Sequence, residues 1–313
     1  MVASIVFQQL LILFGIMFAG LFLSKKGIID ERVCKGLTDL LTYAMQPAFL
    51  LGALQQPRTP KNTAILLTGM GGMFFLVVLG MLLAFLLCKL LKVRRYEAYV
   101  WMCLTGLSNL IYVGKPIVEA LYGGESLFVL SAAAITFNIA GFTVCVLMVT
   151  SGAEMGRPKG FRAYAGRLLN PTAIAGILAV SLYFLDIQFP LPVAGLFHMM
   201  SSPLTPLSML IIGFSLSRVR FKELLTDWKP YALTVLRLFV CPILAYLMMR
   251  EIVHDRFILT ILFVGAAMPA GAITGVICEQ CGSPYRAFAS KSIVISTLFC
   301  LISVPLLMRL LGI

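Results

Sequence analysis

Charged residues are scarce in this 313-residue chain, because Asp, Glu, Lys and Arg make up only 12% of it. A soluble domain typically has about 25%. Charge is missing altogether from residues 1–24, 62–88 and 126–153. Each of these runs is longer than the roughly 20 residues that a helix needs to cross the hydrocarbon core of a bilayer. The composition excludes a soluble globular protein and predicts an all-α polytopic membrane protein.

Acidic residues and histidine are scarcer still: 13 Asp and Glu stand against 25 Lys and Arg, and histidine occurs twice. The sequence has no HExxH motif, no phosphate-binding glycine loop and no paired catalytic carboxylates. Cys278 and Cys281 have the spacing of a metal pair, but no second pair accompanies them. We therefore predict no enzyme, no metal and no cofactor. No segment outside the apolar runs is long enough for a receptor domain.

Ten membrane spans are predicted from the apolar segments. The first one has no basic residue ahead of it, so we expect a retained helix rather than a cleaved signal peptide. The spans are 4–24, 33–54, 63–88, 96–121, 126–150, 169–186, 193–216, 230–250, 257–279 and 286–311.

Basic residues concentrate in alternate loops between these spans. If the N-terminus is outside, the inner loops hold 17 of the 25 Lys and Arg residues, and the outer segments hold 5. The positive-inside rule then predicts that both termini lie outside a cytoplasmic membrane. The same asymmetry explains the net charge of +12, so we expect contact with anionic lipid and none with nucleic acid.

Two prolines occupy matching places in the two halves of the chain. Pro116 and Pro269 are 153 residues apart, each in the fourth span of a group of five. Residues 1–150 would form the first five-helix repeat, 151–168 a cytoplasmic linker and 169–313 a second repeat. Five is odd, so the second repeat would be inverted. Paired interrupted helices in inverted repeats are typical of secondary transporters. We expect spans 4 and 9 to be broken and to expose half-helix N-termini suited to an anion.

At these positions the sequence resembles the auxin efflux carrier family of prokaryotic and plant transporters, in motifs that run nearly from end to end. In chain order the matching residues are Asn109, Gly114, Pro116, Asn170, Pro171, Pro206, Leu207, Leu210, Gly213, Leu216, Arg237, Pro242, Met268, Pro269, Ala270, Gly271, Thr274, Ser296, Thr297, Leu298 and Pro305.

The resemblance implies ten spans in two inverted repeats with crossed broken helices 4 and 9. It also implies that spans 3–5 and 8–10 move against a scaffold of spans 1, 2, 6 and 7, in an elevator-type mechanism, and that the scaffold forms a homodimer. The chain departs from the family pattern at Lys115 and Ile273, so the identity of the substrate does not carry over.

We predict a secondary active or facilitative transporter of a small organic anion, such as a carboxylate. The alternative is a sodium- or proton-coupled exchanger or symporter of similar fold. No aspartate lies in either broken stretch, which argues against the alternative. The predicted substrate-binding residues are Gln46, Asn109, Lys115, Pro116, Asn138, Pro269, Thr274 and Lys291.

Several of these residues also have purely structural interpretations. Asn109 could hydrogen-bond between helices, and Lys115 could pair with Glu119, four residues on. Lys291, which the 153-residue spacing relates to Asn138, could extend to the membrane interface or donate to carbonyls freed at the breaks. For Arg237 we expect a structural role, with Asp39 or a helix C-terminus as its partner.

Overall fold

The computed structural model describes residues 2–151, 171–218 and 227–313, and within these ranges all the regular elements are helices. The predicted linker beyond Ser151, and Asn170 of the family motif, lie outside the described residues.

The helices follow one another in two series. The first comprises α1 (Val2–Lys25), α2 (Glu31–Leu40), η1 (Leu41–Met45), α3 (Gln46–Ala53), α4 (Pro60–Leu90), α5 (Arg95–Gly106), η2 (Leu110–Gly114), α6 (Lys115–Tyr122), α7 (Ser126–Ala140), η3 (Gly141–Cys145) and α8 (Val146–Thr150). The second comprises α10 (Pro171–Phe184), α11 (Leu191–Ser201), α12 (Leu204–Arg218), α14 (Lys229–Val235), η4 (Leu236–Val240), α15 (Cys241–Met249), α16 (Arg256–Ala267), α17 (Ala272–Gln280) and α18 (Arg286–Leu311). The segments labelled η are π-helical.

Long apolar helices are prominent in the described part of the chain. Six of them are long and apolar enough to cross a membrane: Ser4–Lys25, Pro60–Leu90, Ser126–Thr150, Leu191–Arg218, Lys229–Met249 and Arg286–Leu311. Pro171–Phe184 and Arg256–Ala267 are apolar but shorter. The described helices overlap the predicted spans in their order, and three of those spans hold helices separated by non-helical residues, at 107–109, 202–203 and 268–271.

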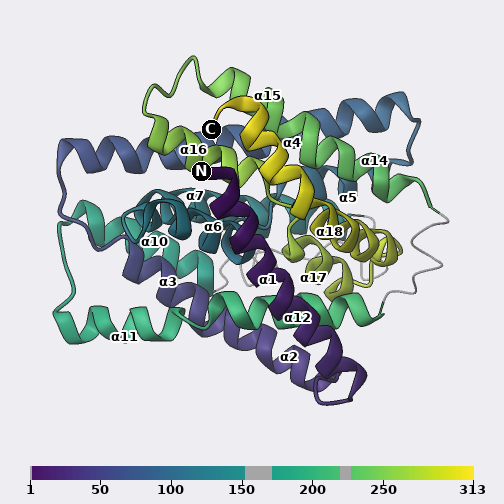
Figure 1. The fold of residues 1–313 in the computed structure, drawn as a ribbon, viewed down its shortest axis with the longest axis horizontal. Coiled ribbons are helices and arrows are strands. Elements are labelled where there is room, and N and C mark those ends of the chain that lie inside the picture. Colours follow the sequence, from purple (N-terminus) through teal and green to yellow (C-terminus); the bar gives the residue numbers. More distant parts are fainter. Residues whose placement is uncertain (1, 152–170, 219–226) are drawn as a thin grey trace.

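The helices pack in two groups (Figure 1). In the first, α1 lies along α12, and α3 packs against α10 and α11. In the second, α4 packs against α5 and α7, while α18 packs against α14 and α17 and α15 against α16. The groups meet where α1 contacts α6 and α18, where α7 contacts α3 and α10, and where α12 contacts η2.

Two glycines allow α1 and α12 to pack with their backbones in contact. A Cβ atom on Gly20 would lie 2.5 Å from the carbonyl oxygen of Leu210. A Cβ atom on Gly213 would overlap the carbonyl oxygen of Met17 and lie 2.7 Å from the backbone nitrogen of Leu21. Small residues permit this kind of close helix packing in membranes, where no hydrophobic force drives helices together.

We expect Gly213→Ala to destabilise the protein by about 1–3 kcal/mol, the usual cost of overpacking, because its Cβ would meet rigid backbone. The matched control is Gly195→Ala in α11, where a Cβ meets nothing within 4 Å. The control should keep or raise the apparent melting temperature of the detergent-solubilised protein, since alanine is the better helix former. Equal melting temperatures for the two variants would contradict this packing.

Three of the π-helical segments precede a proline. Pro47, Pro116 and Pro242 each lie two residues after the end of η1, η2 or η4. Ahead of Pro116, for example, the N–H of Lys115 bonds to the carbonyl of Leu110, five residues back. A proline normally clashes with the carbonyl of the preceding turn, and the wider π turn relieves that clash. These helices therefore continue through their prolines.

Two breaks in the described helices fall in predicted spans 4 and 9, one in each series. α16 ends at Ala267 and α17 begins at Ala272, so the second break contains Pro269, as predicted. The first break lies at residues 107–109, between α5 and η2, rather than beside Pro116. The structure corrects the predicted position here, because the π turn of η2 lets the helix pass through Pro116.

Candidate substrate-binding site at the helix breaks

The two breaks pair with each other through their backbones. The N–H of Asn109 donates to the carbonyl of Pro269, and the N–H of Gly271 donates to the carbonyl of Leu107, both at 2.8 Å. This forms a single antiparallel bridge between Ser108 and Ala270. The two extended stretches satisfy each other's polar groups, which makes irregular backbone tolerable in a buried position.

The bridge also fixes the register of the two breaks. It pairs Ser108 with Ala270, which are 162 residues apart in the sequence, whereas Pro116 and Pro269 are 153 residues apart. The spacing that matches the two prolines therefore does not match the two breaks. The proposed equivalence of Asn138 and Lys291 rested on that spacing and loses its basis.

Arg237 joins the C-terminal ends of the two first half-helices. Its Nη1 donates to the carbonyl of Thr105 in α5 at 2.7 Å. Its Nε donates to the carbonyl of Met268 at 3.1 Å, and its Nη2 to that of Gly265 in α16 at 3.3 Å. A helix C-terminus carries roughly half a negative charge, so the buried guanidinium neutralises two such ends at once. Of the two expected partners, a helix C-terminus is the one observed.

The N-terminal ends of the two second half-helices face a cavity of about 340 Å³. Its lining includes residues 108–112 at the start of η2 and 271–273 at the start of α17. Neither half-helix has a side-chain cap: Asn109 and Gly271 stand at the N-cap positions and make no capping hydrogen bond. By contrast, side chains of Asp30, Thr59 and Asp255 cap α2, α4 and α16.

Two buried polar side chains at the first break lack a partner among the described residues. They are the amide Nδ2 of Asn109 and the hydroxyl of Ser108, and both residues line the cavity. Asn109 is only 4% exposed. A buried polar group without a hydrogen bond typically costs about 1–3 kcal/mol, so its presence calls for an explanation. A ligand in the cavity would supply one.

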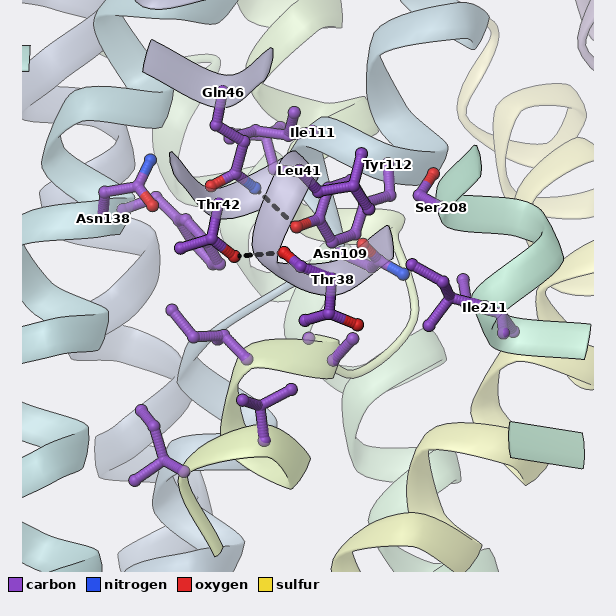
Figure 2. Close-up of a pocket in the computed structure, with 18 of the residues that line it drawn as sticks. Thr38, Leu41, Thr42, Gln46, Asn109, Ile111, Tyr112, Asn138, Ser208 and Ile211 are labelled. Carbon is purple, nitrogen blue, oxygen red and sulfur yellow. Dashed lines mark hydrogen bonds between the residues drawn. The ribbon is translucent and has the colours of Figure 1, made fainter. Parts of the chain in front are cut away.

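A chain of hydrogen bonds joins Thr172, Gln46 and Tyr112, and Figure 2 shows its bond between Gln46 and Tyr112. The side-chain Nε2 of Gln46, in α3, donates to the hydroxyl of Tyr112, in η2, at 2.7 Å. The hydroxyl of Thr172, in α10, donates to Oε1 of Gln46 at 3.3 Å and to the carbonyl of Thr42 at 3.0 Å. These bonds connect the first group of helices to the interrupted helix of the second.

Three of the predicted site residues line this cavity: Gln46, Asn109 and Asn138. Asn138 is buried, and its Nδ2 donates to the carbonyl of Ala134, one turn back, at 2.8 Å. In Figure 2 it lies on the opposite side of the view from Ile211. Among the described residues that line the cavity, Asp39 alone carries a charge.

The other five predicted residues lie outside the lining. The ammonium of Lys115 is 3.1 Å from a carboxylate oxygen of Glu119 and 5.7 Å from the centre of the Phe49 ring. The ion pair with Glu119 is the structural role of Lys115 that was the alternative to substrate binding. Lys291 lies partly buried on α18.

Pro116, Pro269 and Thr274 are buried close to the breaks. Pro116 lies in α6, and the carbonyl of Pro269 accepts the bridge hydrogen bond from Asn109. The thiol of Cys145 approaches the Thr274 hydroxyl, with 3.9 Å between sulfur and oxygen.

Several polar residues of the cavity were not predicted from the sequence, chiefly Thr38, Thr42, Ser108, Tyr112 and Ser208. A signal for two of them was present, because Thr38, Thr42 and Gln46 are spaced four apart and so share one face of a helix. Tyr112 follows Asn109 by three residues, which again favours one face. Ser208 carried no such signal.

One family model matches most of the chain. A family described as membrane transport protein matches residues 5–308. No curated protein matches the chain. With its apolar helices this is a multi-pass membrane protein. The match covers nearly the whole sequence, and the chain therefore belongs to the auxin efflux carrier family of membrane transporters.

Proposed function

We propose that the protein transports small organic anions and that they bind in the cavity at the two helix breaks. The observation that carries this proposal is the buried Asn109 amide, whose Nδ2 has no partner among the described residues and lies at an uncapped helix N-terminus. Lys115 and Lys291 lie outside the cavity and would contact the substrate only in another conformation.

A carboxylate fits the charge and the donors of this site. Each helix N-terminus carries roughly half a positive charge and free N–H groups, and the ends of two helices face the same cavity. The amide of Asn109 and the hydroxyl of Ser108 add side-chain donors. The volume, about 340 Å³, is in the range of about 300–1,000 Å³ that is usual for small-molecule sites.

For the membrane arrangement we propose ten spans in two inverted repeats, with spans 4 and 9 broken and both termini outside the cell membrane. The two helix groups support an elevator-type mechanism: the group with the breaks would move against the group built on α1, α3, α10, α11 and α12. We propose that the latter group is also the homodimer surface. The two ends of the chain lie close together in Figure 1, where α1 packs against α18. This supports ends on one side of the membrane, which is what an even number of spans requires.

A cation-coupled transporter is the second candidate, and Asp39 is the observation that favours it. Its carboxylate lines the cavity and could bind a proton or sodium ion that travels with the anion. The carbonyls at the breaks are a poorer cation site, because Arg237 already donates to those of Thr105, Gly265 and Met268. Anion uptake that needs a sodium or proton gradient, and loses that need in Asp39→Asn, would favour this candidate.

Ligand-induced stabilisation tests the anion proposal. A ligand that binds the folded state at 100 times its dissociation constant stabilises it by about 2.7 kcal/mol. We expect at least one member of a set of mono- and dicarboxylates to raise the melting temperature of the purified protein in proportion to the logarithm of its concentration. The neutral carboxamide of the same skeleton is the matched control and should not. Equal shifts from acid and amide, or no shift from any acid, would contradict the proposal.

A further inference from the structure

Tyr112 places a hydroxyl group at the cavity that Asn109 also lines. It lies in η2, three residues after Asn109, which stands at the N-cap of that helix. Both line the cavity, and Figure 2 shows the Tyr112 hydroxyl directed toward Gln46.

The hydrogen-bond chain from Thr172 determines what this hydroxyl can do. The Thr172 hydroxyl shares its single proton between the carbonyl of Thr42, at 3.0 Å, and Oε1 of Gln46, at 3.3 Å. The contact with Oε1 turns the amide nitrogen of Gln46 toward Tyr112, where it donates at 2.7 Å. A phenol has one proton to donate and oxygen lone pairs that accept. Because the oxygen accepts from Gln46, its proton stays available, and no acceptor for it is found among the described residues.

We propose that Tyr112 is a specificity-determining residue that donates this proton in a hydrogen bond to the carboxylate bound at Asn109. Gln46 and Thr172 act as positioning residues: they hold the phenol oxygen as an acceptor and so direct its proton into the cavity. This inference rests on the proposed function. It adds a third side-chain donor to those of Ser108 and Asn109, and it favours ligands whose oxygens carry a full negative charge.

The first test compares two tyrosine-to-phenylalanine variants. Tyr112→Phe removes the hydroxyl that faces the cavity. The matched control, Tyr183→Phe, removes a hydroxyl that also bonds between helices, to Thr63 at 3.0 Å, but outside the cavity lining. The probes are succinate and indole-3-acetate, together with any acid that stabilises the wild-type protein, and the readout is the dissociation constant from titration. We expect Tyr112→Phe to weaken binding by about tenfold, and Tyr183→Phe to leave it unchanged.

The second test uses Thr172→Val, alone and combined with Tyr112→Phe. Removing the Thr172 hydroxyl frees the Gln46 amide to rotate. We therefore expect carboxylate binding to weaken about two- to fivefold. This is less than in Tyr112→Phe, because the Tyr112 hydroxyl itself is still present. In the Tyr112→Phe background the same change should have no further effect on affinity, since there is no phenol left to orient. If Thr172 had a purely structural role, the losses of binding free energy in the two single variants would instead add up in the double variant.

The outcomes separate the inference from the proposed function. If no acid binds the wild-type protein, the proposed function fails, and this inference fails with it. If acids bind the wild type and Tyr112→Phe equally well, only the inference is overturned. It is also overturned if Tyr183→Phe weakens binding as much as Tyr112→Phe, or if the losses from Thr172→Val and Tyr112→Phe add.

Discussion

Arg237→Met is expected to cause the largest loss of stability of any single substitution considered for this protein. The change leaves the carbonyls of Thr105, Gly265 and Met268 without their donor in a buried position. Each buried group that loses its partner costs about 1–3 kcal/mol, and a typical protein is stable by only about 5–15 kcal/mol. We therefore expect little folded protein, measured as the monodisperse fraction in size-exclusion chromatography after detergent extraction.

Two further variants sharpen this prediction. Arg237→Lys keeps a positive charge and three donors on one nitrogen, but it lacks the planar fork that spans both helix ends, so we expect partial recovery. Arg250→Met is the control: this arginine is exposed and bonds to its neighbour Glu251, and its removal should change little. If the Arg237→Met protein folds and has the wild-type melting temperature, the hydrogen bonds from Arg237 to the two half-helices are not needed for stability.

Asn109→Ala is expected to reduce carboxylate binding by tenfold to a hundredfold while leaving the fold intact. The loss corresponds to one hydrogen bond to a charged group, about 1.5–3 kcal/mol. Stability should not fall, because Nδ2 of Asn109 has no partner among the described residues that its removal could orphan. Titration calorimetry gives the affinity, and the melting temperature without ligand gives the stability.

Asn109→Asp provides a nearly isosteric comparison. It replaces the amide donor with a carboxylate that repels an anion, so we expect weaker binding than in Asn109→Ala. Asn62→Ala, at the exposed start of α4, controls for the loss of an asparagine elsewhere. If Asn109→Ala unfolds the protein, Asn109 would serve only to hold helices together.

Part of this site could be predicted from sequence because its chemistry is local. Pro269 lacks an N–H and breaks its helix, and Asn109 is costly in an apolar segment unless it has a purpose. Both residues lie at the crossing of the two broken helices. The face shared by Thr38, Thr42 and Gln46 is equally local, and it could have been found from spacing alone.

The remainder depends on contacts between residues far apart in the chain. No periodicity relates Arg237 to the carbonyls of Thr105 and Gly265, or Gln46 to Tyr112. The break in span 4 was misplaced because a proline shows where an N–H is missing but not whether a π turn will accommodate it. The 153-residue spacing rests on the two prolines rather than on the two breaks, and the expected match of Asn138 with Lys291 rests on that spacing.

Transport by reconstituted protein tests the central claim most directly. Wild-type protein and the Asn109→Ala variant are placed in liposomes, and uptake is followed for a labelled acid that stabilises the wild-type protein. We predict saturable uptake by the wild type, competition by the unlabelled acid but not by its amide, and uptake near that of protein-free liposomes for Asn109→Ala. Uptake by Asn109→Ala at the wild-type rate, or none by the wild type, would contradict an anion site at the helix breaks.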